Sequence, residues 1–180
     1  DIGIAAAVAR RLGALGAYHF TELVPAFLRR GQQTLQARFP DLPGLTFAPL
    51  DMNRPFEPQG VAPGSRSVVY AVNTLHVARD LYFTLGEIRD ALAPGGRLVF
   101  SECVRMQPGQ PLNAEFIFNL MATFRSQRPD TPGQPPAGFL LPGQWKATLE
   151  TAGFTDVRFL PDVLAFSERF PRFHAAAIGA

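Results

Sequence analysis

Cysteine, lysine and net charge are all scarce in this chain. Cys103 is the only cysteine, so no disulfide can form within the sequence, and Lys146 is the only lysine. The formal net charge of +2, with no Lys/Arg run longer than two residues, is too weak for a typical nucleic-acid-binding surface. No apolar run approaches the roughly 18 residues that a membrane span requires. We therefore expect a cytoplasmic protein with neither nucleic acid nor a membrane as a partner.

The spacings typical of metal and nucleophile sites are missing as well. No HxH, CxxC or HExxH pattern occurs, so a metal held by the protein is not expected. Neither a GxSxG nucleophile elbow nor a phosphate-binding P-loop occurs. Glycine and proline are abundant, with 16 and 17 residues, and they divide the chain into short segments. Candidate residues are therefore sought at the ends of the predicted strands.

The order of these segments predicts an α/β fold. Short apolar runs alternate with helix-length segments, which is the pattern of a doubly wound, Rossmann-like and mostly parallel sheet. With 180 residues, of which 47% are hydrophobic, the chain can bury one core, so we expect a single domain over 1–180. We expect strands at 17–21, 45–50, 67–72, 97–101, 154–160 and 173–178, the last two as an antiparallel C-terminal hairpin, and helices at 2–14, 25–39, 81–92, 112–125 and 144–151.

Two apolar runs within 67–102 each lead into a polar residue. The first continues into Asn73-Thr74-Leu75-His76, and the second ends at Ser101-Glu102. Open α/β sheets bind ligands at the carboxyl ends of their strands. A histidine suits proton removal at neutral pH, and a carboxylate on its other ring nitrogen would fix its tautomer. If the strands are neighbours, His76 and Glu102 form a candidate base dyad; a helix-capping histidine and a solvated glutamate are the alternative.

Two acidic residues follow the earlier strands. Glu22 comes directly after the run 17–21, where a nucleoside-binding sheet places a carboxylate on the ribose hydroxyls. The alternative is an acid that the dipole of the following helix favours. Asp51 ends the next strand, where it can accept an exocyclic amine such as that of adenine, with Met52 against the ring. Its alternative is an aspartate that starts a turn.

Five blocks stand in order between residues 18 and 154. They are Tyr18-His19-Phe20-Thr21-Glu22, Leu50-Asp51-Met52 with Gln59-Gly60, Asn73-Thr74-Leu75-His76, Leu92-Ala93-Pro94-Gly95-Gly96, and WKATLETAGF at 145–154. They are similar to the blocks Tyr-x-Phe-Thr-Asp, Leu-Asp-Ile with Gln-Gly, Asn-Val-Leu-His, Leu-x-Pro-Gly-Gly and Trp-x-x-x-Leu-x-x-Ala-Gly-Phe. These blocks belong to class I S-adenosylmethionine-dependent methyltransferases. Within that class the chain most resembles the methyltransferase domains embedded in polyketide synthases.

The resemblance implies S-adenosylmethionine as the cofactor, with S-adenosylhomocysteine as its product. Glu22 and Leu23 would bind the ribose, and Asp51 and Met52 would flank the adenine. The family's glycine-rich GxGxG loop is missing, and only Gly3 stands near its place. Glu22 also replaces the family's aspartate. We therefore expect an incomplete domain that lacks the first strand and the glycine loop.

The resemblance also implies the catalytic residues. His76 would be the base, Glu102 would orient it, and Asn73 would contact the cofactor near the transferring methyl group. The expected reaction is methyl transfer to an acyl or polyketide chain, at the α-carbon or at an oxygen. The alternative is a catalytically silent, structural domain of a synthase.

The expected acceptor is a small or carrier-protein-tethered acyl chain, in a protein with flanking synthase domains. Such a substrate would enter under the segment 103–143, whose helix and Pro/Gly-rich loop would form a wall. Arg105, Arg125 and Arg128 would meet a phosphopantetheine phosphate there, or else lie on the solvated surface.

Overall fold

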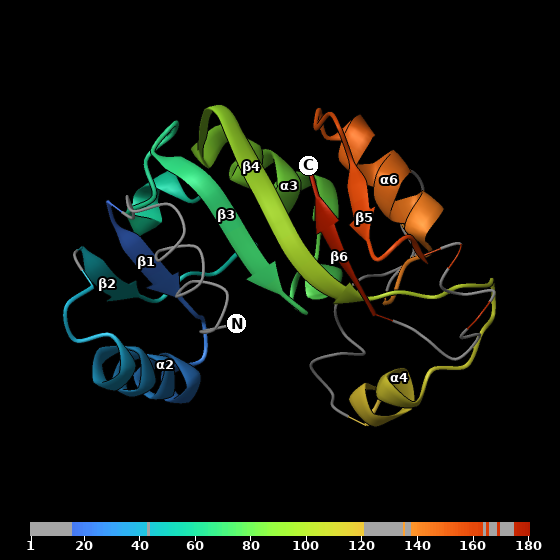
Figure 1. Ribbon diagram of the computed structural model, residues 1–180, viewed down its shortest axis with the longest axis horizontal. Coiled ribbons are helices and arrows are strands. Elements are labelled where there is room, and N and C mark those ends of the chain that lie inside the picture. Colours follow the sequence, from blue (N-terminus) through green and yellow to red (C-terminus); the bar gives the residue numbers. More distant parts are fainter. Residues whose placement is uncertain are drawn as a thin grey trace. The chain divides into compact units, whose positions relative to one another are not determined.

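The computed structural model describes residues 16–42, 44–120, 135, 138–163, 165, 169 and 175–180. They fall into two compact units, divided after Asp51 (Figure 1). The helix expected at 2–14, and Gly3 within it, lie outside the described residues. That the chain forms a single domain stays a prediction.

In the described part of the first unit, 16–42 and 44–51, two parallel strands accompany one helix. Strand β1 (Tyr18–Thr21) pairs with β2 (Leu45–Ala48) in register from Tyr18 opposite Leu45 to Thr21 opposite Ala48. Helix α2 (Pro25–Arg38) connects them and begins with a proline, as predicted. It lies so close to β1 that a Cβ on Gly31 would be 2.5 Å from a ring carbon of Phe20. A glycine is therefore required where α2 crosses the strand.

The second unit is built on a four-stranded sheet of order β3-β4-β6-β5. Strand β3 runs parallel to β4, whereas β6 is antiparallel to both β4 and β5. The elements are β3 (Arg66–Val72), α3 (Leu81–Ala91), β4 (Leu92–Cys103), α4 (Asn113–Phe118), α6 (Pro142–Thr151), β5 (Arg158–Leu160) and β6 (Ala175–Gly179), with short 3-10 turns η1 (Glu57–Gln59) and η2 (Leu75–Val77). The predicted α/β class and the antiparallel C-terminal hairpin are confirmed.

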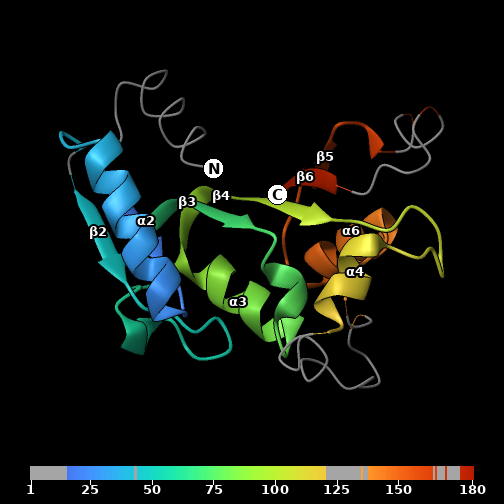
Figure 2. The same ribbon diagram turned by 90° about the horizontal axis from the view of Figure 1, so that it is seen from below.

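Helix α3 covers one face of this sheet (Figure 2). Leu81, Leu85 and Ile88 recur at helical spacing and are buried against it. The helix begins at a capped end, where Asp80 Oδ1 accepts the backbone N–H of Phe83 at 2.9 Å. On α6, Trp145 is fully buried, and its ring lies 5.0 Å from that of Phe100 on β4. The sheet therefore has a continuous apolar core beneath it, and its strand ends are held rigidly.

Three predicted boundaries differ from the structure by more than two residues. Strand β4 begins at Leu92, not at residue 97, because Leu92 already pairs with Arg66 on β3. A Cβ on Gly96 would lie 2.8 Å from the Ala93 carbonyl oxygen, so the Pro-Gly-Gly segment that predicts a turn also allows this close pairing. Strand β5 begins only at Arg158, since Gly153 and Asp156 adopt positive φ angles of 91° and 57°. Helix α4 ends at Phe118, and 121–125 lie outside the described residues.

Candidate active site

His76 and Glu102 come together at the carboxyl ends of neighbouring strands. Asn73 follows β3 and its N–H donates to the Ser101 carbonyl of β4 at 2.6 Å, which aligns the two strand ends. His76 Nδ1 lies 2.6 Å from Glu102 Oε2. Both residues are buried, with 3% and 1% of their surface exposed. The predicted meeting of these side chains is found in the structure, and a solvated glutamate is excluded.

Glu102 also organises the turn that carries the histidine. Its Oε1 accepts the backbone N–H groups of Thr74, Leu75 and His76 at 3.0, 2.8 and 3.3 Å. An ionised carboxylate can accept from all of these groups, and a hydrogen on His76 Nδ1 would then point at Oε2. This tautomer places the ring's lone pair on Nε2. One carboxylate thus fixes the backbone and the ring of the same residue.

Asn73 stands in a strained position beside this pair. Its φ of 46° lies in the left-handed region, which asparagine tolerates better than most residues. The residue is exposed, and the chain turns there from β3 into η2. The backbone strain is offset by the Asn73–Ser101 hydrogen bond and by the contacts of Glu102 to the following residues. Strain held at the end of a strand is typical of functional sites.

Two aromatic rings pack on the His76 ring. The Phe139 centroid lies 4.7 Å and the Phe118 centroid 6.4 Å from that of His76, and the two phenyl rings are 6.1 Å apart. We refer to Phe118 and Phe139 as the aromatic cover. Phe118 ends α4, which lies beyond the carboxyl ends of β3 and β4 (Figure 1). The predicted wall from the segment 103–143 therefore contacts the candidate base directly. The sequence analysis missed both rings, although Phe139 stands out as an aromatic residue in a Pro/Gly-rich segment.

Arg105 is largely buried and is engaged by groups of the protein itself, and its contact with a phosphopantetheine phosphate stays a prediction. Its side chain is 20% exposed, and it pairs with the Glu115 carboxylate of α4. Its Nε donates to the Phe139 carbonyl at 3.0 Å, and its backbone N–H donates to the Leu140 carbonyl at 3.0 Å. The prediction that it lies on the solvated surface is therefore wrong, because these groups use its guanidinium. Arg125 and Arg128 lie outside the described residues.

Met52, at the start of the second unit, is fixed by α3. The Thr84 hydroxyl donates to the Met52 carbonyl at 3.0 Å, and Asn53 Oδ1 accepts the Arg79 N–H at 2.7 Å. Further along the loop, Glu87 Oε2 accepts the Phe56 N–H at 2.6 Å. Thr84 is fully buried, so the loop after β2 is tied to the core of the sheet. These hydrogen bonds fix the backbone position of Met52 relative to α3.

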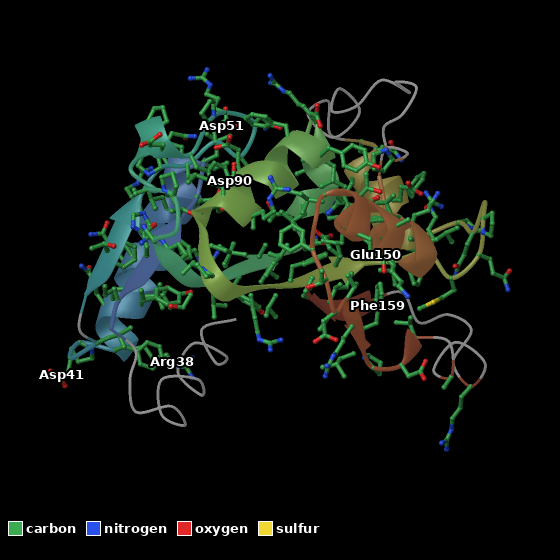
Figure 3. All side chains as sticks on the ribbon, turned by 90° about the horizontal axis from the view of Figure 1, so that it is seen from above. Arg38, Asp41, Asp51, Asp90, Glu150 and Phe159 are labelled. Carbon is green, nitrogen blue, oxygen red and sulfur yellow. The ribbon has the colours of Figure 1, made fainter. Side chains whose placement is uncertain are left out.

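The carboxylates of the first unit follow paired parallel strands. The Glu22 N–H donates to the Ala48 carbonyl at 3.4 Å, so Glu22 and Asp51 stand at the same end of the β1–β2 pair (Figure 3 labels Asp51). Glu22 Oε1 accepts the Val24 N–H at 3.0 Å, beside the first turn of α2. Leu23, which lies between Glu22 and Val24 in the sequence, is 54% exposed. The contact of Glu22 with the Val24 N–H is the helix-terminal role named above as the alternative for this residue, and the nucleoside-binding role of Glu22, Leu23 and Asp51 stays a prediction.

Two other titratable side chains, Cys103 and His19, lie in or at the end of strands. Burial, with the nearby Glu102 charge, raises the pKa of the Cys103 thiol, so the thiol stays protonated at neutral pH. His19 lies in β1 with its Nδ1 3.2 Å from the Thr46 hydroxyl, and His174 lies outside the described residues. Within the described ranges no three His, Cys, Asp or Glu side chains gather as a metal site would need. In the same ranges, every helix is too short or too polar to cross a membrane.

The similarities to known proteins agree with this geometry. No protein-family model matches the chain. It is 40% identical over 100 residues to highly reducing polyketide synthase 2 of Gibberella zeae, covering 53% of this chain and 4% of that protein. It is 31% identical over 144 residues to the lovastatin diketide synthase LovF of Aspergillus terreus, covering 79% of this chain and 6% of that protein. The chain thus spans only a small part of these relatives.

A solved structure shows the same fold. The CurJ carbon methyltransferase superimposes with a TM-score of 0.74 and 30% sequence identity, over 91% of this chain and 41% of that one. The parallel strands and the antiparallel hairpin give the chain a Rossmann-like fold that is consistent with the class I S-adenosylmethionine-dependent methyltransferases. The chain resembles the methyltransferase domains of polyketide synthases.

Proposed function

We propose that this chain transfers a methyl group from S-adenosylmethionine to an acyl chain of the polyketide type, with His76 as the general base. The observation that carries the proposal is the 2.6 Å contact of the buried His76 Nδ1 with Glu102 Oε2, at the carboxyl ends of two parallel strands. The similarity to polyketide synthases and to a carbon methyltransferase supports the substrate class.

The resemblance assigns the cofactor to Glu22, Leu23, Asp51 and Met52. The carboxylate of Glu22 suits the two ribose hydroxyls, with Leu23 beside it, and Asp51 suits the adenine amine. Met52 would lie against the adenine ring, at a height set by the Thr84 hydroxyl. When bound, S-adenosylmethionine supplies an activated methyl group on a sulfonium. Gly3 stays a candidate from the sequence alone.

The protein's own part in the reaction is proton removal and alignment. His76 Nε2 takes the proton of the acceptor, and the ring becomes a cation whose charge Glu102 stabilises through Nδ1–H. Removal of this proton would leave the acceptor an electron pair with which to bond the methyl group, and S-adenosylhomocysteine would be the leaving group. Asn73 would contact the cofactor near that methyl group. Alignment matters because a displacement of about 1 Å can reduce the rate about a hundredfold.

We infer the α-carbon between two carbonyls as the acceptor rather than an oxygen. The buried dyad can remove a proton from either acceptor, so the support for carbon comes from the similarity to solved structures. CurJ, the solved structure described above, is itself named a carbon methyltransferase. The acyl chain would be tethered to a carrier protein, and flanking synthase domains would supply it.

The test is a methylation assay with a β-ketoacyl thioester and S-adenosylmethionine, using the protein with its flanking sequence. Mass spectrometry should find one added methyl group, and fragmentation should place it on the α-carbon. A methyl group on oxygen would leave the dyad in place and change the acceptor. No methylated product from any acyl thioester, with the cofactor shown to bind, would contradict the proposal.

A catalytically silent, structural domain of a synthase is the second candidate. Such a domain would keep the fold but bind no cofactor. Isothermal titration with S-adenosylmethionine distinguishes the two: measurable binding supports the enzyme, and no heat of binding at any concentration supports the silent domain.

A further inference from the structure

Arg105 connects the two parts of the aromatic cover. It lies two residues after β4 and pairs with Glu115 in the middle of α4, the helix that ends at Phe118. The same side chain donates from Nε to the carbonyl of Phe139. One guanidinium thus holds both segments that bring phenyl rings onto His76.

Both segments depend on tertiary contacts for their positions. Helix α4 has six residues and no side-chain hydrogen bond at its N-cap, and isolated helices of that length do not form in water. Its exposed faces carry Phe116 and Ile117. Phe139 lies in an irregular stretch before α6, where it is buried. The Arg105 side chain adds polar contacts to both segments and joins them.

We propose that Arg105 is a positioning residue that keeps the aromatic cover closed over His76, and so keeps water from the base. Arginine suits this task because its planar fork donates in several fixed directions at once, which lysine does not. The Nη1 atom adds a third contact, to the Gln110 carbonyl at 2.5 Å, and Gln110 Oε1 in turn accepts the Met106 N–H at 2.8 Å. The Arg105 guanidinium thereby contacts three segments: the turn that follows β4, helix α4, and the segment that carries Phe139.

The first experiment measures access to His76 without any turnover. Diethyl pyrocarbonate modifies accessible, neutral imidazoles, and peptide mass spectrometry reports the modification rate of His76 by itself. Arg105→Ala should raise that rate about tenfold, in line with the loss of a positioned cover. The matched control is Arg158→Ala, which removes an arginine paired with Asp156 on the exposed strand β5 and should leave the rate unchanged. Equal rates in the two variants overturn the proposal.

The second experiment asks whether Arg105 acts through the cover. Phe139→Ala opens the cover directly, so adding Arg105→Ala to it should raise His76 modification by less than twofold more. Fully multiplicative effects would mean that Arg105 acts elsewhere and would overturn the proposal. If Arg105→Ala does not fold, Glu115→Gln replaces it, since it keeps the shape and removes the charge partner, and about a threefold increase is expected. No increase in that variant, with the fold retained, would also contradict the proposal.

A third arm uses the methylation assay and rests on the proposed function. Arg105→Ala should reduce kcat about tenfold and leave the KM for S-adenosylmethionine within twofold, because no cofactor residue has moved. A stabilising role alone would change the unfolding temperature and leave kcat intact below it. If the unmodified protein transfers no methyl group, the proposed function fails, while the His76 modification rates still decide the role of Arg105.

Discussion

Glu102 Oε1 lies 2.8 Å from the backbone nitrogen of Leu75, inside the turn that carries His76. Its other oxygen holds the His76 ring. The two oxygens of this buried side chain therefore have different tasks: Oε1 sets the path of the backbone, and Oε2 sets the tautomer of the base. Replacing one oxygen by an amide nitrogen, and in a second variant removing both oxygens, tests the two tasks.

Glu102→Gln tests the tautomer. Its amide oxygen can still accept the N–H groups of the turn, which turns the amide NH2 toward His76 Nδ1. Nδ1 must then accept, and the hydrogen moves to Nε2, so kcat should fall about a thousandfold or more. The free energy of unfolding should change by less than about 1.5 kcal/mol. Steady-state methylation and urea unfolding measure both; a kcat within tenfold of the unmodified protein would contradict the role of Oε2.

Glu102→Ala tests the backbone task. It leaves three buried N–H groups and an imidazole without their acceptor, so we expect a loss of about 3–5 kcal/mol in the free energy of unfolding. The comparison with Glu102→Gln isolates this loss from side-chain size. Equal stability of the two variants would show that the turn does not depend on the carboxylate.

His76→Ala tests the base itself. Turnover should fall to the background rate, because no other described histidine lies at this strand end, and the affinity for S-adenosylmethionine should stay within a few-fold. Isothermal titration measures the affinity and mass spectrometry the methylated product. His19→Gln, in β1, is the control for loss of a histidine and should retain turnover. Turnover retained in His76→Ala would refute the base.

The sequence predicted the site better where backbone topology decides than where side chains meet. Apolar runs predict where strands end, and parallel neighbours bring those ends together. The sequence therefore predicts that His76 and Glu102 lie close together, and the structure shows this contact. The three backbone contacts of Glu102 could not be predicted, because they depend on a 3-10 turn that leaves no apolar pattern. Arg105 looked like a surface charge for the same reason: its partner Glu115 is ten residues away, on a short helix whose position depends on tertiary contacts.

The boundaries of the strands also depend on tertiary contacts that the local sequence does not reveal. The Pro-Gly-Gly stretch predicts a turn, and Gly95 does adopt a φ of 75°, yet the ladder between Arg66 and Leu92 extends β4 across it. Pairing with a distant strand outweighed local turn propensity there. The nucleoside-binding roles of Glu22, Leu23, Asp51 and Met52 stay predictions, as does the role of Asn73.

Asn73→Gly and Asn73→Ala separate the strain at this position from the side chain. Glycine adopts a φ of 46° without strain, whereas alanine does not, so only the alanine variant should lose about 1 kcal/mol of unfolding free energy. If the side chain contacts the cofactor, both variants should lose turnover alike. Unfolding curves and methylation rates decide this together. Full turnover in Asn73→Gly would show that the backbone, and not the amide, is what the position requires.

Thr84→Val tests whether the backbone position of Met52 matters for the proposed cofactor binding. The change keeps the shape of the side chain but removes the hydroxyl that donates to the Met52 carbonyl at 3.0 Å. The affinity for S-adenosylmethionine should fall about fivefold, equal to about 1 kcal/mol, because the loop becomes free to shift away from the adenine. The rate constant kcat at saturating cofactor should be unchanged, since the base dyad is not altered. Thr148→Val is the matched control, because Thr148 is also a buried helical threonine, on α6, and its loss should leave the affinity as it was. Equal affinities in the two variants would mean that Met52 does not depend on Thr84, and its role beside the adenine would lose its structural support.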